Sequence, residues 1–258
     1  MIRLVLVGAA GRMGRAVEQA AGEADGFEIK ARVVAAGDPL GSEPGWSRSI
    51  ADSVSAGDVV IEFSSPAAAR ETAEICAERR AALVSGTTGL SPEEDAAIQR
   101  AARRTAVLRA ANFSLGVLAL RRALAAALLA LPRDWDVEIV ERHHRRKLDS
   151  PSGTAMALAR EAAALRELPA EALRHGRQGR AGPRPAAEIG MHAVRGGSWV
   201  GDHLVLLAGE GEWLELRHVA QDRGAFAQGA LAAAQFVATA SPGLYTLEQV
   251  LTTQGRTH

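Results

Sequence analysis

Residues 141–155, which read ERHHRRKLDSPSGTA, bring together side chains of the types that acid–base sites use. The two adjacent histidines and Lys147 can donate protons, and an imidazole exchanges its proton near neutral pH. A Ser-Gly-Thr turn stands directly before a helical pattern, so the backbone N–H groups of Gly153 and Thr154 can hold a carboxylate at a helix N-terminus. Three functions compete for this stretch: a nucleic-acid surface, a metal site, and a pocket that binds and protonates an anionic small molecule.

The composition and the spacing favour the third of these functions. The chain of 258 residues has 30 Lys and Arg against 30 Asp and Glu, and only 4% of its residues are aromatic. Nucleic-acid binders usually show a basic surplus or interleaved aromatic residues. A metal site is disfavoured because His143 and His144 cannot both face one point along a strand and the chain has one cysteine. We therefore predict an anion pocket, no metal and no nucleic-acid partner, with Arg142, Arg145 and Arg146 as solvated charges.

A glycine turn near the N-terminus is a second candidate site. The segment GAAGRMG places Gly8, Gly11 and Gly14 between an apolar strand pattern and a helical pattern. Glycines permit a tight turn and close backbone approach, so the N–H groups at the start of the helix can bind a pyrophosphate. The alternative is that these glycines only end the strand. The segment SGTTG, residues 85–89, also follows a strand pattern, and a plain turn before a capped helix explains it equally well.

Strand and helix patterns alternate around the glycine turn. Short apolar runs are expected to form strands at residues 2–7, 27–34, 58–63, 82–86 and 105–110, with helical patterns between them. Strict alternation of this kind is typical of a parallel sheet with helices on both faces. The sequence therefore predicts an α/β fold with a Rossmann-like, doubly wound parallel sheet over residues 1–112.

The pattern changes after residue 112. A long helix is expected over residues 115–131, followed by a strand, the histidine-containing stretch, another helix and three β-rich segments separated by glycine turns. We predict an α+β domain over residues 113–224, with an open mixed sheet in which most neighbours are antiparallel. Residues 225–258 return to a helical pattern and are assigned with residues 1–112 to the first domain. The Gly-, Pro- and Arg-rich stretch 174–186 predicts a mobile surface loop.

Cysteine usage and hydropathy indicate the compartment. The single cysteine, Cys76, excludes a disulfide within the chain and is expected to be a small buried helix residue. The longest apolar stretch, residues 123–131, is far shorter than the roughly 20 residues of a membrane span. The N-terminal apolar run ends in glycines and lacks a signal-peptide cleavage pattern. We expect a cytoplasmic protein with no membrane partner.

The motifs together resemble one enzyme family. GAAGRMG, SGTTG, AANFSLGV and ERHHRRKLDSPSGTA look like the 4-hydroxy-tetrahydrodipicolinate reductases (dihydrodipicolinate reductases) of bacterial lysine and diaminopimelate biosynthesis, and the resemblance runs from residue 2 to about residue 251. It implies an oxidoreductase that uses NADH or NADPH to reduce 4-hydroxy-tetrahydrodipicolinate to tetrahydrodipicolinate. It also implies that the first domain binds the nicotinamide cofactor, while the second binds the dicarboxylate substrate and builds a homotetramer through its sheet.

The resemblance also implies individual roles. His143 would be the proton donor and Lys147 would share the acid role, while His144, Gly153 and Thr154 would bind substrate. The residues implied to bind the cofactor are Gly8, Ala9, Ala10, Gly11, Arg12, Met13, Gly86, Thr87, Thr88, Ala110, Ala111, Asn112 and Phe113. A substrate with two carboxylates explains the local density of cations in a protein of zero net charge.

Two positions depart from the family pattern. Val34 and Ala35 stand where the family commonly has an acidic residue followed by arginine. Neither side chain attracts or repels the 2′-phosphate of NADPH, so we predict use of both NADH and NADPH. Glu62 stands where an aspartate is usual.

Two other functions remain open at this point. A dehydrogenase acting on aspartate or homoserine would explain the glycine turn but not the full stretch from His143 to Thr154. A non-enzymatic nucleotide sensor would keep the three glycines but would have no need of His143 with Lys147.

Overall fold

The computed structural model describes residues 1–254, and the chain divides into two compact units. Unit 1 comprises Met1–Leu115 with the described part of Arg223–His258, and unit 2 comprises Gly116–Asp222. Unit 1 is thus formed by two separate stretches of chain, and unit 2 is inserted between them in the sequence. Each unit has its own sheet and its own apolar core.

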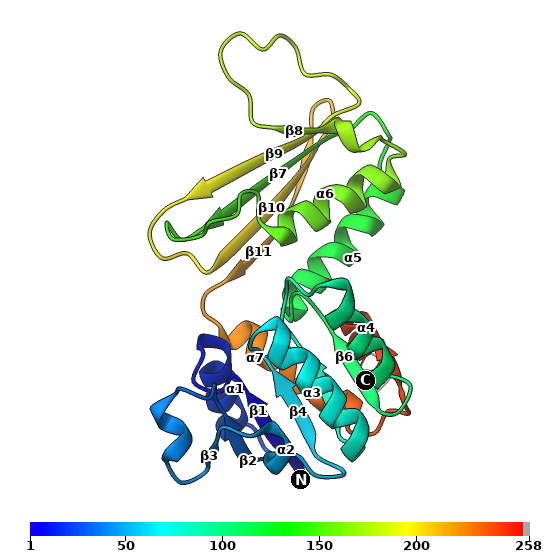
Figure 1. Cartoon of the computed structure of the whole chain (residues 1–258). Helices are drawn as coiled ribbons and strands as arrows, with labels where there is room; N and C mark the ends of the chain where they lie inside the picture. Colours follow the sequence, from blue (N-terminus) through cyan, green and yellow to red (C-terminus); the bar gives the residue numbers. More distant parts are fainter. Residues whose placement is uncertain (255–258) are drawn as a thin grey trace. The chain divides into compact units, whose positions relative to one another are not determined.

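Unit 1 is built on a seven-stranded sheet in the order β12-β6-β5-β4-β1-β2-β3, in which every pair is parallel (Figure 1). Its strands are β1 (Ile2–Val7), β2 (Phe27–Val33), β3 (Trp46–Ser47), β4 (Val59–Glu62), β5 (Ala82–Ser85), β6 (Ala106–Arg109) and β12 (Gly243–Tyr245). The strand order reverses between β1 and β4, and open α/β sheets bind ligands at such a switch point. The predicted Rossmann-like sheet is confirmed.

Helices cover both faces of this sheet. The helices are α1 (Arg12–Glu23), α2 (Ile50–Ser53), α3 (Pro66–Arg79), α4 (Pro92–Ala101), α7 (Gly224–Val237) and α8 (Leu247–Gln254), with a 3-10 turn η1 at Pro39–Ser42. Helix α1 packs with α7, and α3 packs with α2 and α4 (Figure 1). Right-handed crossovers on the two sides of the switch point place these two groups on opposite faces. Val5, Val60 and Leu83 are fully buried between them, as is Cys76, whose pKa is raised by burial.

Unit 2 has a five-stranded mixed sheet in the order β11-β10-β7-β9-β8. Its elements are α5 (Leu115–Ala130), β7 (Asp136–His143), α6 (Gly153–Leu165), η2 (Ala170–Ala172), β8 (Leu173–His175), β9 (Ile189–Arg195), β10 (Gly201–Ala208) and β11 (Trp213–Ala220). The mixed sheet is confirmed, but the expected excess of antiparallel pairs is wrong. Strand β10 is antiparallel to β7 and β11, whereas β9 is parallel to β7 and β8. The reason is that two crossovers bring the chain back in the same direction: the α6 connection leads from β7 to β8, and the long loop 176–188 leads from β8 to β9.

One face of this sheet carries both the apolar core and the acid–base residues. Side chains along β7 alternate between buried and half-buried, and Ile139, Glu141 and His143 share the buried face. Leu124 of α5 and Leu158 of α6 pack on that face with Ile139. The polar pair therefore lies at the carboxyl end of a strand whose preceding residues form the core.

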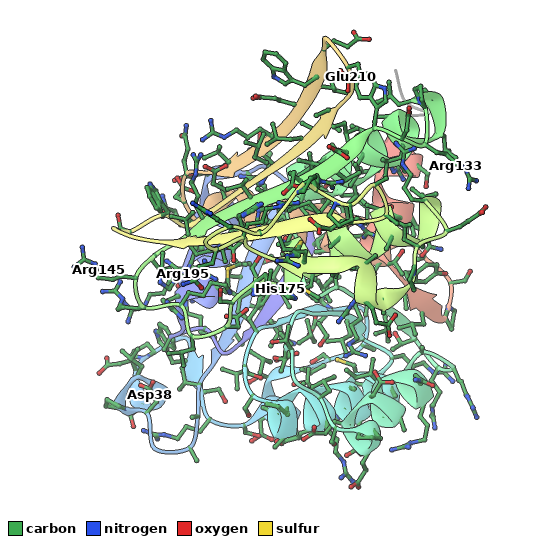
Figure 2. All side chains as sticks on the ribbon, turned by 90° about the horizontal axis from the view of Figure 1, so that it is seen from above. Asp38, Arg133, Arg145, His175, Arg195 and Glu210 are labelled. Atoms are coloured by element: carbon green, nitrogen blue, oxygen red, sulfur yellow. The ribbon has the colours of Figure 1, made fainter. Side chains whose placement is uncertain are left out.

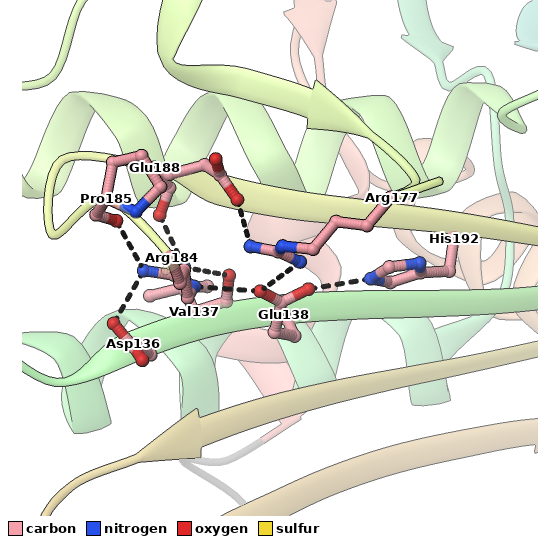
Figure 3. A network of polar contacts seen from close by, with 8 residues as sticks. All are labelled: Asp136, Val137, Glu138, Arg177, Arg184, Pro185, Glu188 and His192. Carbon is pink, nitrogen blue, oxygen red and sulfur yellow. Dashed lines mark hydrogen bonds and ion pairs between the residues drawn. The ribbon is translucent and has the colours of Figure 1, made fainter. Parts of the chain in front are cut away.

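The opposite face of β7 anchors the long loop that precedes β9 (Figure 3). Arg184 donates from Nε to Glu138 at 2.9 Å and from Nη1 to Asp136 at 2.5 Å, and Arg177 donates to Glu138 at 3.2 Å. Arg177 also pairs with Glu188. The stretch predicted as a mobile loop is thus mostly exposed but tied to the sheet by two of its arginines, and its first two residues belong to β8.

Candidate active site

Glu141 forms the centre of a buried polar cluster at the carboxyl end of β7. Its Oε2 lies 2.5 Å from Nδ1 of His143, and the guanidinium of Arg195 donates to both carboxylate oxygens at 2.7 and 2.8 Å. The backbone N–H of Ser152 donates to Oε1 at 3.0 Å. Glu141 is fully buried and His143 is 8% exposed. We call these four residues, together with His203, the Glu141 cluster.

The charge state of Glu141 follows from these contacts. Burial by itself would raise the pKa of Glu141, but the hydrogen bonds from Arg195, His143 and Ser152 outweigh it and hold that pKa below its ordinary value. The ionised carboxylate accepts only, so Nδ1 of His143 carries a hydrogen and donates it to Glu141. This arrangement fixes the orientation of the imidazole and leaves its Nε2 as the atom that exchanges a proton.

Strand register explains why these residues meet. Glu141 and His143 are two positions apart on β7 and therefore share one face. The parallel register of β7 and β9 pairs His143 with Arg195, and the antiparallel register of β7 and β10 pairs Glu141 with His203. Three strands that are distant in sequence thus deliver one acid, one guanidinium and two imidazoles to one end of the sheet.

His203 adds a neutral imidazole beside His143. The two rings are edge to face with centroids 5.2 Å apart, and Nε2 of His203 lies 3.1 Å from Oγ of Ser152. Burial, together with the neighbouring His143, lowers the pKa of His203 to about 4. At neutral pH His203 therefore adds no positive charge to the cluster.

Ser152 connects the cluster to the first turn of α6. It is the N-cap of that helix, and its Oγ accepts from the backbone N–H of Ala155 at 3.2 Å. Gly153 is exposed and Thr154 is half-buried in the same turn. The first N–H groups of a helix have no carbonyl acceptor within the helix, so this turn can bind an anion. The predicted carboxylate cradle thus adjoins the Glu141–His143 pair through a direct hydrogen bond to Ser152.

Lys147 and His144 lie on the loop between β7 and α6. Nζ of Lys147 is 2.8 Å from Oδ1 of Asp149, and this hydrogen bond lowers the pKa of Asp149. Nη2 of Arg195 donates to the carbonyl of Asp149 at 2.8 Å, which ties the loop to the Glu141 cluster. His144 is half-buried, and its backbone N–H donates to the carbonyl of Trp199 at 2.8 Å.

The three arginines of residues 141–155 lie outside the Glu141 cluster. Arg145 and Arg146 are exposed, as predicted. The prediction of a solvated charge is wrong for Arg142, which is half-buried and pairs with the buried Asp202 of β10, because strand alternation turns it to the other face of β7. Figure 2 shows Arg145 toward the end of the sheet where Arg195 also lies. Within residues 1–254, no group of three or more His, Cys, Asp or Glu is arranged to hold a metal ion.

The glycine turn lies at the switch point of the sheet in unit 1. Gly8 has φ +81°, and a Cβ at this position would lie 2.2 Å from the carbonyl oxygen of Phe63. Gly14 is buried in α1, and a Cβ there would lie 2.4 Å from the carbonyl oxygen of Gly8. Gly11 is exposed at the N-cap of α1. The three glycines thus supply a turn, close helix packing and an open approach to a helix N-terminus, as a pyrophosphate site requires.

A groove of about 610 Å³ opens at this turn. Of the residues implied to bind the cofactor, Gly8, Ala10 and Gly11 line the groove, together with Val34 and Ala35 from the end of β2. Ala9 is buried below the turn, while Arg12 is exposed and Met13 half-buried in the first turn of α1. The groove therefore runs from the glycine turn to the end of the second strand.

The other implied cofactor residues follow β5 and β6 and do not line this groove. The hydroxyl of Thr87 donates to the buried Glu62, and Ser85 donates to Glu62 at 2.8 Å. A Cβ on Gly86 would lie 2.0 Å from the ring of Phe63, which itself packs edge to face on Phe113. Thr88 and Ala111 are exposed, and Ala110 and Asn112 are half-buried. This group lies at the same carboxyl edge of the sheet, with Glu62 holding its loop.

A Rossmann-like sheet with a glycine turn at its switch point, joined in one chain to a unit with a buried acid–base pair, has the plan of a nucleotide-dependent oxidoreductase. The chain belongs to the dihydrodipicolinate reductase family. Residues 2–113 match the family described as Dihydrodipicolinate reductase, N-terminus, and residues 116–251 match Dihydrodipicolinate reductase, C-terminus. The chain is thus an oxidoreductase. Its Rossmann-like unit supports the assignment of a pyridine nucleotide as the cofactor.

Individual relatives agree with this assignment. The chain is 45% identical to a 4-hydroxy-tetrahydrodipicolinate reductase of Thermomicrobium roseum, over 98% of this chain and 100% of the relative. It is 43% identical to the enzyme of the same name from Anaeromyxobacter sp. (strain Fw109-5), over 97% and 98%. A solved structure, dipicolinate-bound dihydrodipicolinate reductase from Paenisporosarcina sp. TG-14, superimposes with a TM-score of 0.77 at 25% identity, covering 95% and 97%.

Proposed function

We propose that this chain reduces 4-hydroxy-tetrahydrodipicolinate to tetrahydrodipicolinate with NADH or NADPH, in lysine and diaminopimelate biosynthesis. The observation that carries the proposal is the Glu141–His143 pair beside the first turn of α6, in a chain whose relatives are named for this reaction. A pocket with a proton donor and a carboxylate cradle fits a substrate that has two carboxylates and must be protonated. The relative from Paenisporosarcina has dipicolinate, a dicarboxylate, bound.

His143 acts as the proton donor in this proposal. Loss of the 4-hydroxyl group as water leaves an unsaturated dihydrodipicolinate ring, and the nicotinamide cofactor, when bound, would supply a hydride to that ring. The negative charge that develops on the ring is quenched by a proton from Nε2 of His143, whose other nitrogen is held by Glu141. The carboxylate of Glu141 stabilises the protonated imidazole before the transfer, and the guanidinium of Arg195 keeps that carboxylate ionised.

The other implied residues bind the substrate or support the acid. Gly153 and Thr154 hold one carboxylate with backbone N–H groups, and His144 contributes a further donor. Lys147 attracts the anionic substrate and shares the acid role, after exchanging its exposed partner Asp149 for a substrate carboxylate. Gly8 to Met13 hold the cofactor phosphates, and the loops at Gly86–Thr88 and Ala110–Phe113 line the nicotinamide end.

The test is cofactor oxidation that depends on the substrate. The absorbance of NADH or NADPH at about 340 nm should fall when 4-hydroxy-tetrahydrodipicolinate is supplied, and it should stay constant with aspartate semialdehyde, the oxidised partner of homoserine. Turnover with aspartate semialdehyde would identify a different dehydrogenase. Cofactor binding without any turnover would instead identify a nucleotide sensor.

The proposal extends to the cellular setting. We expect a cytoplasmic homotetramer, because the family resemblance implies assembly through the sheet of unit 2. Analytical ultracentrifugation of the purified chain measures the assembly, and a monomer at micromolar concentration would contradict it. Within residues 1–254, no helix is long and apolar enough to cross a bilayer.

A further inference from the structure

The groove of unit 1 contains a cation that the sequence pattern does not reveal. In dinucleotide-binding folds, the residue at the end of the second strand separates NADH from NADPH, because an acidic side chain binds the ribose hydroxyls and an arginine binds the 2′-phosphate. Val34 and Ala35 occupy that place here and do neither. Asp38 and Arg48, however, also line the same groove.

The short strand β3 brings Arg48 to this groove. Trp46 and Ser47 pair in parallel register with Arg32 and Val33 at the end of β2, and the backbone N–H of Val34 donates to the carbonyl of Ser47 at 3.0 Å. Arg48 directly follows this paired segment. It therefore stands beside the end of β2, next to the position where a discriminating residue is expected.

Contacts with the η1 turn hold the Arg48 side chain in place. Its Nε and Nη2 donate to the carbonyl of Asp38 at 3.2 and 2.9 Å, and Nη2 also donates to Oγ of Ser42 at 3.0 Å. The side chain crosses Gly41 so closely that a Cβ there would lie 2.4 Å from Cγ of Arg48. Three backbone and side-chain contacts thus orient the guanidinium, although the residue itself is exposed.

The charge of Arg48 remains available to a ligand. Among residues 1–254, Arg48 joins no ion pair with a carboxylate, and its Nη1 makes no hydrogen bond to protein. Arg32, on the neighbouring strand, is instead paired with Glu18 at 2.6 Å. A guanidinium fixed through two of its nitrogens, with the third open, matches the geometry in which arginine binds a phosphate.

Acidic residues in the same groove are suited to bind the ribose hydroxyls of NADH. Asp38, labelled in Figure 2 on the loop that follows β2, accepts from the backbone N–H of Leu40 through Oδ1 at 3.0 Å. Its second oxygen can accept a ribose hydroxyl. Glu71 of α3 also lines the groove and is exposed. The groove thus contains a hydrogen-bond donor for the 2′-phosphate of NADPH, Arg48, and an acceptor for the ribose hydroxyl of NADH, Asp38.

We propose that Arg48 recognises the 2′-phosphate of NADPH in this chain, in place of a residue that directly follows the second strand. This inference rests on the proposed function, since it concerns the cofactor of that reaction. Arg48 then contributes to the affinity for NADPH, while the affinity for NADH depends on the other residues of the groove.

Titration calorimetry of the full-length protein with NADP⁺ and NAD⁺ tests the proposal without turnover. Arg48→Ala should weaken NADP⁺ binding by about tenfold or more, because a charge-assisted hydrogen bond is lost, and should leave NAD⁺ binding within about twofold. Added salt should weaken NADP⁺ binding more than NAD⁺ binding in the unmodified protein, and this difference should disappear in Arg48→Ala. Arg100→Ala, which removes an exposed arginine of α4 outside the groove, should change neither affinity.

A second variant guards against a folding defect. Arg48→Gln keeps a donor for the carbonyl of Asp38 but removes the charge, so it should reproduce the selective loss of NADP⁺ binding. Equal weakening of both dinucleotides, or no weakening of NADP⁺ in either variant, would overturn the role of Arg48. An unmodified protein that binds neither dinucleotide would overturn the proposed function itself, and this inference with it.

Discussion

The carboxylate of Glu141 lies 2.5 Å from Nδ1 of His143, and both side chains are buried on one face of β7. The bidentate contact from Arg195 keeps the carboxylate ionised, so the pair can stabilise a protonated imidazole in a nearly dry site. In the proposed reaction, Glu141 therefore acts through His143, as a positioning residue.

Glu141→Gln should lower kcat by about tenfold or more while dinucleotide affinity stays unchanged. The loss should fall on kcat and leave KM nearly unchanged, because the carboxylate contacts the imidazole of His143. Glu138→Gln is the matched control, since Glu138 lies on the same strand but on the opposite face, paired with Arg184. An unchanged kcat in Glu141→Gln, or an equal loss in Glu138→Gln, would contradict the role of Glu141 in orienting His143.

This pair could have been predicted in part from the sequence. Glu141 and His143 stand two residues apart in a strand pattern, and that spacing alone places them on one face. The partnership with Arg195 and His203 could not be predicted, because it depends on which strands become neighbours and in which register. The prediction of mostly antiparallel pairing in unit 2 was wrong for the same reason, because the sequence pattern does not show which strands are neighbours in the sheet.

Local pattern predicted the parallel sheet of unit 1 because most of its longer strands are apolar runs bounded by turn residues, while β2 shows the alternation of a strand. It missed β3 and β12, which have two and three residues, since a period of two cannot be seen over so short a length. Missing β3 also hid Arg48, whose place at the end of β2 follows only from that pairing.

Two glycines of α1 provide a matched test of the glycine turn. Gly14→Ala should destabilise the protein by about 1–3 kcal/mol and weaken dinucleotide binding, because the new Cβ would overlap backbone atoms of Gly8 and Ala9. Gly22→Ala adds a Cβ with no atom within 4 Å, and it should stabilise the helix by up to about 1 kcal/mol. Urea unfolding measures both. Similar stability changes for the two variants would contradict the close packing of the turn on α1.

His203 predicts a pH dependence of stability. Its pKa in the folded protein is about 4, below the ordinary value of 6.5, so the folded state resists protonation more than the unfolded state does. Its contribution to stability is therefore complete above pH 6.5 and is lost as the pH falls from 6.5 to about 4, by about 3 kcal/mol in total.

Unfolding free energies from urea titrations across this pH range test the assignment. The fall should be smaller in His203→Gln, and it should persist in His175→Gln, which changes an exposed histidine of β8. An equal fall in His203→Gln and the unmodified protein would assign the pH dependence to other groups.

The anchored loop of unit 2 gives a further prediction. Arg184→Ala removes hydrogen bonds to Asp136, Glu138 and the carbonyl of Glu188, and it should lower the unfolding free energy by about 1–3 kcal/mol. Limited digestion with a protease that does not cut after arginine should then cleave faster within residues 176–188. Arg180→Ala, in an exposed part of the same loop, should leave the cleavage rate unchanged. Equal rates for both variants would mean that the network in Figure 3 does not restrain the loop.

In the proposed reaction, His143 delivers the proton that accompanies reduction of the dicarboxylate ring. The most direct measurement is the kcat of His143→Gln with 4-hydroxy-tetrahydrodipicolinate and NADPH, alongside Lys147→Ala and the calorimetric affinity of each variant for the dinucleotide. We expect a loss in kcat of about a hundredfold or more for His143→Gln, a comparable loss for Lys147→Ala, and unchanged dinucleotide affinity in both. Near-normal turnover of His143→Gln would contradict the role of His143 as the proton donor, because no acid would then be needed at the end of β7.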